Sequence, residues 1–137
     1  MNFFDKLTAA IDRNQSLLYL ELDPDPESLP EKALSSSKLP AETDNQTLIK
    51  NWLESFKYVI DKTVDFVCAY KLTLGYYQSL SSHGIELLQK TIKTIPSNIP
   101  IILDAKHGDL NASTVFARTI FEQWEVDAVT VTPYTGH

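Results

Sequence analysis

The stretch IILDAKHGDL, residues 101–110, places three charged side chains directly after an apolar run. Asp104 and Lys106 are two residues apart, so both project to the same side while the strand remains extended. Asp109 follows where the chain turns toward the next helix. Carboxylates beside a lysine offset the desolvation of its ammonium and hold its head group in one position. This spacing is typical of a proton donor or an electrostatic clamp that faces an anionic substrate.

Two earlier apolar runs also end in polar residues. Asp23 closes the run SLLYLELD, and Lys71 lies near the end of DFVCAYKLT. Functional groups of parallel α/β folds collect at the carboxyl ends of the strands, where residues distant in sequence meet. The charges of Lys71, Asp104, Lys106 and Asp109 sum to zero, so an alternating cluster would be self-compensating. We therefore expect these strand ends to form one site.

A purely structural interpretation fits the same residues. An Asp-x-Lys at a strand end often lies in a solvated loop, and Asp109 could simply cap the following helix. The segment PDPESLP favours a turn over a site. His83, His107 and His137 share no ligand spacing, so the sequence predicts no metal site. No glycine-rich phosphate-binding pattern supports dinucleotide or P-loop nucleotide binding.

Composition narrows the class of protein. The 137 residues are 43% hydrophobic and 22% charged, as expected for one globular domain. A net charge of -6 disfavours nucleic acid or an anionic membrane as the main partner. Cys68, the single cysteine, has no partner for an internal disulfide, which favours a reducing compartment. With no signal peptide and no apolar run near the roughly 20 residues of a membrane span, we expect a soluble cytoplasmic protein.

Hydrophobic periodicity predicts helices and strands in alternation. Thr43 and Gln46 fit a capping box at the start of the clearest helix, and residues 31–41 are expected to form a loop. The third helix is expected to be interrupted near His83 and Gly84. The predicted helices are residues 3–14, 43–62, 75–95 and 112–124, and the predicted strands are residues 16–23, 65–73, 100–106 and 127–134.

This order predicts an α/β fold with a parallel sheet, because each parallel connection needs a crossover. The strand ends at Asp23, Lys71, Asp104 and Pro133 recur at intervals that suit one strand–helix unit each. Both a doubly wound sheet and a (β/α)₈ barrel are built from such units. The spacing leaves these two folds open.

Four segments, in order, resemble orotidine 5′-phosphate decarboxylase in its longer bacterial branch. They are LDPDPESLP in the first strand region, CAYKLTLGYY in the second, LDAKHGDL in the third and AVTVTPYTG in the fourth. LDAKHGDL matches the Asp-x-Lys-x-x-Asp signature, the most specific of the four. The resemblance runs along nearly the whole chain. The resemblance extends to cyanobacterial-type relatives, in which the domain can be joined to orotate phosphoribosyltransferase.

The resemblance implies a (β/α)₈ barrel that forms a homodimer with active sites shared at the subunit interface. It implies decarboxylation of orotidine 5′-phosphate to uridine 5′-phosphate in pyrimidine biosynthesis, with no metal or organic cofactor. A complete barrel takes about 250 residues, so residues 1–137 would be a partial barrel domain that ends after strand four. The phosphate-binding groups lie in later loops of the family. Activity is therefore expected to need the C-terminal half.

The resemblance also implies roles for individual residues. Lys106 would protonate the ring carbon as carbon dioxide leaves. Asp104 would sit beside the substrate carboxylate and, with Asp109, hold the lysine. Asp109 would act on the neighbouring subunit's site. Lys71 would bind ribose and complete the charge network.

Two more residues would bind substrate, and four depart from common family choices. Asp23 would contact a ribose hydroxyl, and Ser113 would contact ribose across the interface. Glu21 stands where glycine is common, and its carboxylate could crowd or repel the substrate if it points inward. The other departures are Leu72, His107 and Thr132.

Two alternative functions stay open at this point. One is an inactive fragment or degenerate paralogue with a role in assembly through the open edges of a half barrel. The other is a different phosphosugar-binding barrel enzyme, such as a sugar-phosphate decarboxylase or aldolase, which uses similar chemistry at its strand ends.

Overall fold

The computed structural model describes residues 2–25 and 45–135. The predicted loop at 31–41 and Thr43 of the predicted capping box lie outside the described residues. The strands are β1 (Tyr19–Glu21), β2 (Ala69–Thr73), β3 (Ile101–His107) and β4 (Ala128–Val131). The helices are α1 (Phe3–Asn14), α3 (Asn45–Thr63), α4 (Leu74–Gln78), α5 (Ser81–Thr94) and α6 (Ser113–Arg118), followed by a π-helical segment, Thr119–Gln123, and a 3₁₀ turn, Pro133–Thr135.

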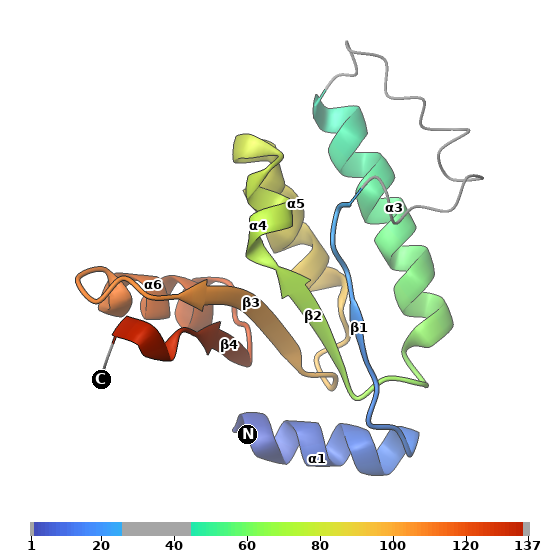
Figure 1. The fold of residues 1–137 in the computed structure, drawn as a ribbon. Helices are drawn as coiled ribbons and strands as arrows, with labels where there is room; N and C mark the ends of the chain where they lie inside the picture. Colours follow the sequence, from blue (N-terminus) through green and yellow to red (C-terminus); the bar gives the residue numbers. More distant parts are fainter. Residues whose placement is uncertain (1, 26–44, 136–137) are drawn as a thin grey trace.

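The four strands form one parallel sheet in the order β1-β2-β3-β4 (Figure 1). A doubly wound sheet reverses its strand order at a switch point, whereas a barrel adds each strand beside the previous one. The observed order is that of a barrel. Of the two predicted folds, the structure therefore has the barrel type, and its four strands form half of a (β/α)₈ barrel.

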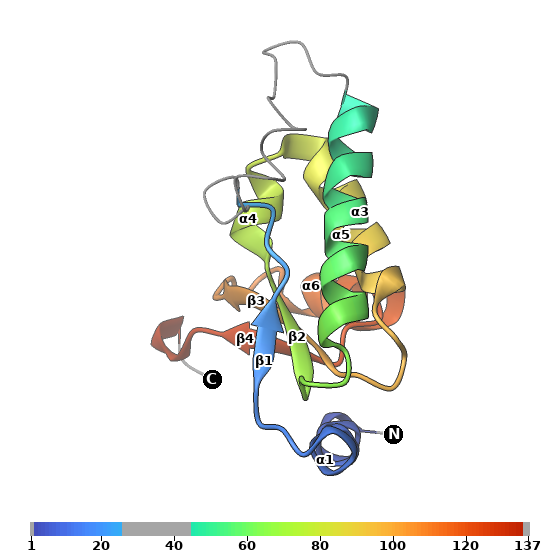
Figure 2. The ribbon, with the colours of Figure 1, turned by 90° about the vertical axis from the view of Figure 1, so that its right-hand side faces the viewer.

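Helices α3, α5 and α6 lie on one side of this sheet (Figure 2). Tyr70 points to that side, because its hydroxyl lies 2.7 Å from Oγ1 of Thr63 on α3. Leu72 and Leu103 are fully buried in the core between sheet and helices. Since successive strand residues alternate between faces, Lys71 projects from the opposite face. This second face carries the polar groups described below.

Helix α1 crosses the amino ends of the strands (Figure 1). Asn2 caps it by accepting a hydrogen bond from the Asp5 amide at 2.9 Å. Lys6 reaches Oδ2 of Asp127 at 2.6 Å. Asn14 ends the helix and donates to the carbonyls of Val64 and Val67, which confirms it as the predicted helix end. The helix thus closes the end of the sheet away from the candidate site.

The predicted interruption of the helix at 75–95 is present, but it lies at Ser79 and Leu80 and not at His83 and Gly84. The chain breaks between α4 and α5, just before Ser81, whose φ of 57° is left-handed. Gly84 lies inside α5, where a Cβ would stand 1.6 Å from the carbonyl oxygen of Tyr77. The glycine therefore allows α5 to approach α4 closely. A glycine in a helical pattern signals either a break or such an approach, and the sequence does not distinguish them.

The last predicted helix is confirmed, and Cys68 is buried, which is common for a cysteine that behaves as a small hydrophobic side chain. The predicted helix at 112–124 is present as α6 and the π-helical segment that continues it. None of the described helices is both long and apolar enough to cross a membrane.

Candidate active site

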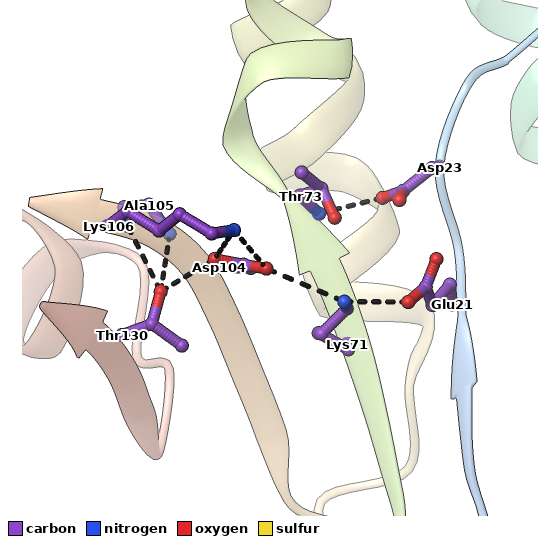
Figure 3. A network of polar contacts seen from close by, with 8 residues as sticks. All are labelled: Glu21, Asp23, Lys71, Thr73, Asp104, Ala105, Lys106 and Thr130. Atoms are coloured by element: carbon purple, nitrogen blue, oxygen red, sulfur yellow. Dashed lines mark hydrogen bonds and ion pairs between the residues drawn. The ribbon is translucent and has the colours of Figure 1, made fainter. Parts of the chain in front are cut away.

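A row of alternating charges crosses the carboxyl end of the sheet (Figure 3). Lys71 Nζ lies 2.6 Å from Glu21 Oε1 and 3.5 Å from Asp104 Oδ2. Lys106 Nζ lies 2.7 and 2.8 Å from the two oxygens of Asp104. The row therefore reads Glu21⁻, Lys71⁺, Asp104⁻, Lys106⁺ and carries no net charge. The predicted grouping of Lys71, Asp104 and Lys106 is confirmed as a geometric arrangement.

Strand register explains why these side chains meet. Glu21 pairs directly with Lys71, and Thr73, two residues further along β2, pairs with Asp104. Residues two apart share a face, so Lys71 and Asp104 are diagonal neighbours on the side away from the helices. Tyr19, two residues before Glu21, lies on the same face, with its ring centre 5.5 Å from Lys71 Nζ.

The contacts favour the charged form of each central group. The Lys106 ammonium, followed by the Thr130 hydroxyl, lowers the pKa of Asp104. The hydrogen bond to Glu21 is the main cause of the raised pKa of Lys71. Asp104 is 10% exposed, whereas Lys106 is 71% exposed. The cluster therefore presents an accessible ammonium anchored on an ionised, largely buried carboxylate.

Asp23 lies two residues beyond the end of β1, beside this row. Its Oδ1 accepts a hydrogen bond from the Thr73 amide at 2.7 Å. Its Oδ2 is buried and has no hydrogen-bond partner among the described residues. Burial is the largest cause of the raised pKa of Asp23. Glu21, Asp23, Asp25 and Tyr76 line a small hollow here, of about 140 Å³, whereas pockets for drug-sized ligands measure roughly 300–1,000 Å³.

Asp109 lies in the turn that leads into α6, and Ser113 is the first residue of that helix. Oδ1 of Asp109 accepts hydrogen bonds from the amides of Asn111 and Ala112 at 2.9 and 3.3 Å. Ser113 Oγ donates to the Asp109 carbonyl at 2.6 Å. Within one chain, Asp109 therefore caps the turn before α6. The predicted capping of the helix itself is not observed, because the N-cap of α6 is Ala112 and no side chain caps it. Within the described residues, the Lys106 ammonium is anchored by Asp104 and not by Asp109.

The sequence does not predict that Glu21 and Thr130 belong to the cluster. The sequence predicts only that Glu21 could crowd a substrate, yet in the structure Glu21 binds Lys71. The alternation of Tyr19, Glu21 and Asp23 in SLLYLELD is the sequence signal that places Glu21 on the face of the site. Thr130 lies in the middle of an apolar run, and its hydroxyl bonds to Asp104 and to the amides of Ala105 and Lys106. Its residue type carried no signal, because threonine is common in strands.

The described residues contain no group of three or more histidine, cysteine, aspartate or glutamate side chains placed to hold a metal ion.

No family model matches the chain. The chain is 54% identical over 136 residues to the "Bifunctional enzyme PyrF/PyrE" of Nostoc sp., covering 99% of this chain and 26% of that protein. It is 38% identical over 138 residues to an orotidine 5′-phosphate decarboxylase of Dehalococcoides mccartyi, covering all of this chain and 45% of that enzyme. The chain is homologous to the N-terminal half of orotidine 5′-phosphate decarboxylase.

A solved structure agrees with this relationship. The Leishmania donovani OMP decarboxylase superposes with a TM-score of 0.73 at 26% identity, covering 99% of this chain and 46% of that one. The chain thus spans less than half the length of these two decarboxylases. Its four strands correspond to the first half of their barrel.

Proposed function

We propose that this chain is the N-terminal half of a barrel domain that decarboxylates orotidine 5′-phosphate to uridine 5′-phosphate in pyrimidine biosynthesis. Residues 1–137 would be one partial domain, completed by a C-terminal half that carries the phosphate-binding loops. The observation that supports this most is the Lys106 ammonium, accessible and held at 2.7 Å from the Asp104 carboxylate. The cytoplasmic location stays a prediction.

The proposed reaction breaks the bond between the ring carbon and the substrate carboxylate. The electron pair of that bond stays on the ring carbon, and Lys106 gives it a proton from Nζ as carbon dioxide leaves. The lysine then regains a proton from water. A fixed ammonium stabilises the negative charge that develops on the carbon more than it stabilises the bound substrate.

Asp104 would face the departing carboxylate. Its contacts with Lys106 and Thr130 lower its pKa, so it stays ionised at neutral pH. Two carboxylates that face each other repel, and departure of carbon dioxide relieves this repulsion. The same carboxylate keeps the Lys106 ammonium in place, which restricts the donor to one direction.

Substrate binding would use Lys71 from the charged row and groups that lie near the row. Lys71 and Asp23 would bind the ribose, and the buried, unpartnered Oδ2 of Asp23 can accept a hydrogen bond from a hydroxyl. Asp109 lies on the turn beyond the end of β3, and Ser113 begins α6 after it. In a homodimer this turn would reach the active site of the neighbouring subunit, where Ser113 would contact ribose. No metal or organic cofactor takes part in this proposal.

A second candidate function rests on Glu21. Its ion pair with Lys71 occupies a side chain that the proposed mechanism assigns to ribose binding. This contact favours a degenerate paralogue in which the cluster persists without turnover. A degenerate chain would lack activity even in a completed barrel, and substituting Glu21 by glycine would restore it.

Turnover assays test these proposals. The polypeptide that contains this chain together with a C-terminal half barrel should decarboxylate orotidine 5′-phosphate and leave ketose acid phosphates unchanged. Conversion of a ketose acid phosphate would instead support the other class of phosphosugar enzyme. Absence of turnover by the completed barrel, before and after Glu21→Gly, would reject the decarboxylase proposal.

A further inference from the structure

The last part of β3 departs from regular pairing with β4. Leu103 pairs with Val129, and the next pair is His107 with Val131. The chain therefore advances four residues along β3 while it advances two along β4. Ala105 and Lys106 lie in the extra length, and Lys106 has a left-handed φ of 45°. Such a bulge removes amides from the ladder, and these amides then need other acceptors.

The hydroxyl of Thr130 provides that acceptor. Thr130 Oγ1 accepts hydrogen bonds from the amides of Ala105 and Lys106 at 3.1 and 3.0 Å. The same hydroxyl donates to Oδ1 of Asp104 at 2.7 Å. A hydroxyl has one proton and two lone pairs. Because both lone pairs receive amides, the proton is directed to Asp104, and all three bonding positions of this hydroxyl are used.

These contacts link the backbone of Lys106 to the carboxylate that its own ammonium binds. A left-handed conformation is unfavourable for a residue with a Cβ and persists where neighbouring groups hold it. Here the regular pairing of β3 with β4 is interrupted at Ala105 and Lys106, while Thr130 keeps the Lys106 amide and Asp104 on one oxygen (Figure 3). Thr130 therefore holds the backbone of Lys106 directly, and it holds the Lys106 ammonium indirectly through Asp104.

We infer that Thr130 is a positioning residue for Lys106 and Asp104, acting through one hydroxyl that stabilises the bulge and orients the carboxylate. The catalytic consequence rests on the proposed decarboxylase function, whereas the structural consequence does not. Charged groups that face Asp104 are Lys106 on its own strand and Lys71 on β2, with Glu21 on β1 behind Lys71. Thr130 contributes the contact from β4.

Thr130→Val tests this inference in the full-length protein, because valine keeps the shape and removes the hydroxyl. Thr130→Ser keeps the hydroxyl and is the conservative rescue. Thr94→Val is the matched control, since the Thr94 hydroxyl donates to the Lys90 carbonyl within α5, away from the site. The ¹³C signal of the Asp104 carboxyl, followed through a pH titration, is the readout that does not depend on turnover.

Thr130→Val should move the titration of Asp104 to higher pH, since a donor to the ionised form is lost. Thr130→Ser and Thr94→Val should leave it in place. Removing a residue that orients a metal ligand lowers metal affinity or activity roughly 10- to 100-fold. By analogy, kcat should fall by about that factor in Thr130→Val, with a smaller change in KM. The acid limb of the kcat profile should also move to higher pH.

Amide exchange of the unmodified protein provides a test that needs no variant. The Ala105 and Lys106 amides should exchange slowly if Thr130 holds them. Fast exchange of both, or an unchanged Asp104 titration in Thr130→Val, would overturn the inference. If the titration shifts while the unmodified full-length protein shows no turnover, the positioning role of Thr130 stands and the decarboxylase proposal fails.

Discussion

Glu21 and Lys71 face each other across the β1–β2 pair, with 2.6 Å between Glu21 Oε1 and Lys71 Nζ. Asp104 lies at 3.5 Å from the same ammonium. Glu21 is therefore the nearer of two carboxylates that share Lys71. The Lys71 ammonium on β2 thus links the Glu21 carboxylate on β1 with the Asp104 carboxylate on β3. A change in either carboxylate should therefore change the contacts of Lys71.

Glu21→Gln should return the pKa of Lys71 toward its ordinary value, because the hydrogen bond to Glu21 is the main cause of the increase. The Lys71 ammonium would then turn to Asp104, and KM for orotidine 5′-phosphate should fall several-fold if Lys71 binds ribose. A titration of the Lys71 side chain by NMR measures the first effect, and steady-state kinetics of the full-length protein measure the second. Glu86→Gln, in the exposed pair with Lys90, is the matched control. An unchanged Lys71 titration would contradict the assigned contact.

Lys106→Ala should abolish nearly all turnover of the completed barrel while the fold stays intact. The side chain is 71% exposed, and substitutions at exposed positions usually change stability by less than about 0.5 kcal/mol. Loss of the ammonium adds only a modest further destabilisation, because the pair is largely exposed at Lys106 and Asp104 keeps Lys71 and Thr130 as partners. Thermal unfolding and kcat are measured together, with Lys50→Ala as a control at the exposed pair with Glu54. Turnover close to that of the control would reject Lys106 as the proton donor.

Asp23→Asn should stabilise the protein at neutral pH and weaken substrate binding. Burial raises the pKa of Asp23, so the folded state binds a proton more tightly than the unfolded state does. Stability contributed by Asp23 is therefore greatest at low pH and falls as pH rises from the ordinary aspartate pKa through the raised one. Asparagine removes this dependence and can still accept from the Thr73 amide. The expected gain at pH 7 is about 1 kcal/mol.

Denaturant unfolding of Asp23→Asn at pH 7 and at acidic pH checks this sign. The difference from the unmodified protein should shrink toward acidic pH. Asp25→Asn serves as a comparison in the same hollow. A variant that is less stable than the unmodified protein at pH 7 would show that the Asp23 carboxylate is compensated by its surroundings.

Gly84→Ala should destabilise the protein by about 2–3 kcal/mol, because an added Cβ would overlap the Tyr77 carbonyl and force α5 away from α4. Gly75→Ala is the control, since a Cβ at Gly75 has no atom within 4 Å. Alanine also favours helix at that position. Equal stability of both variants, measured by denaturant unfolding, would mean that α4 and α5 are not in close contact.

The sequence alone determined the class of fold and the position of the chemistry. Apolar runs that alternate with helical periods require a parallel sheet, and this places Asp23, Lys71 and Asp104 at one edge. The spacing of Asp104 and Lys106 put both charges at the end of the same strand, although in the structure Lys106 lies in a bulge and not in an extended strand. These properties follow from local periodicity, which depends on side-chain order and not on distant contacts.

Only the tertiary structure decided the strand order, the contacts of Glu21 and the role of Thr130. The order β1-β2-β3-β4 selects the barrel type over the doubly wound type, although both have the same alternation of elements. Glu21 finds Lys71 through the β1–β2 register. Thr130 reaches Asp104 because a bulge in β3 shifts the pairing with β4. Register and bulges arise from pairing between separate segments, so residue order within one segment does not specify them.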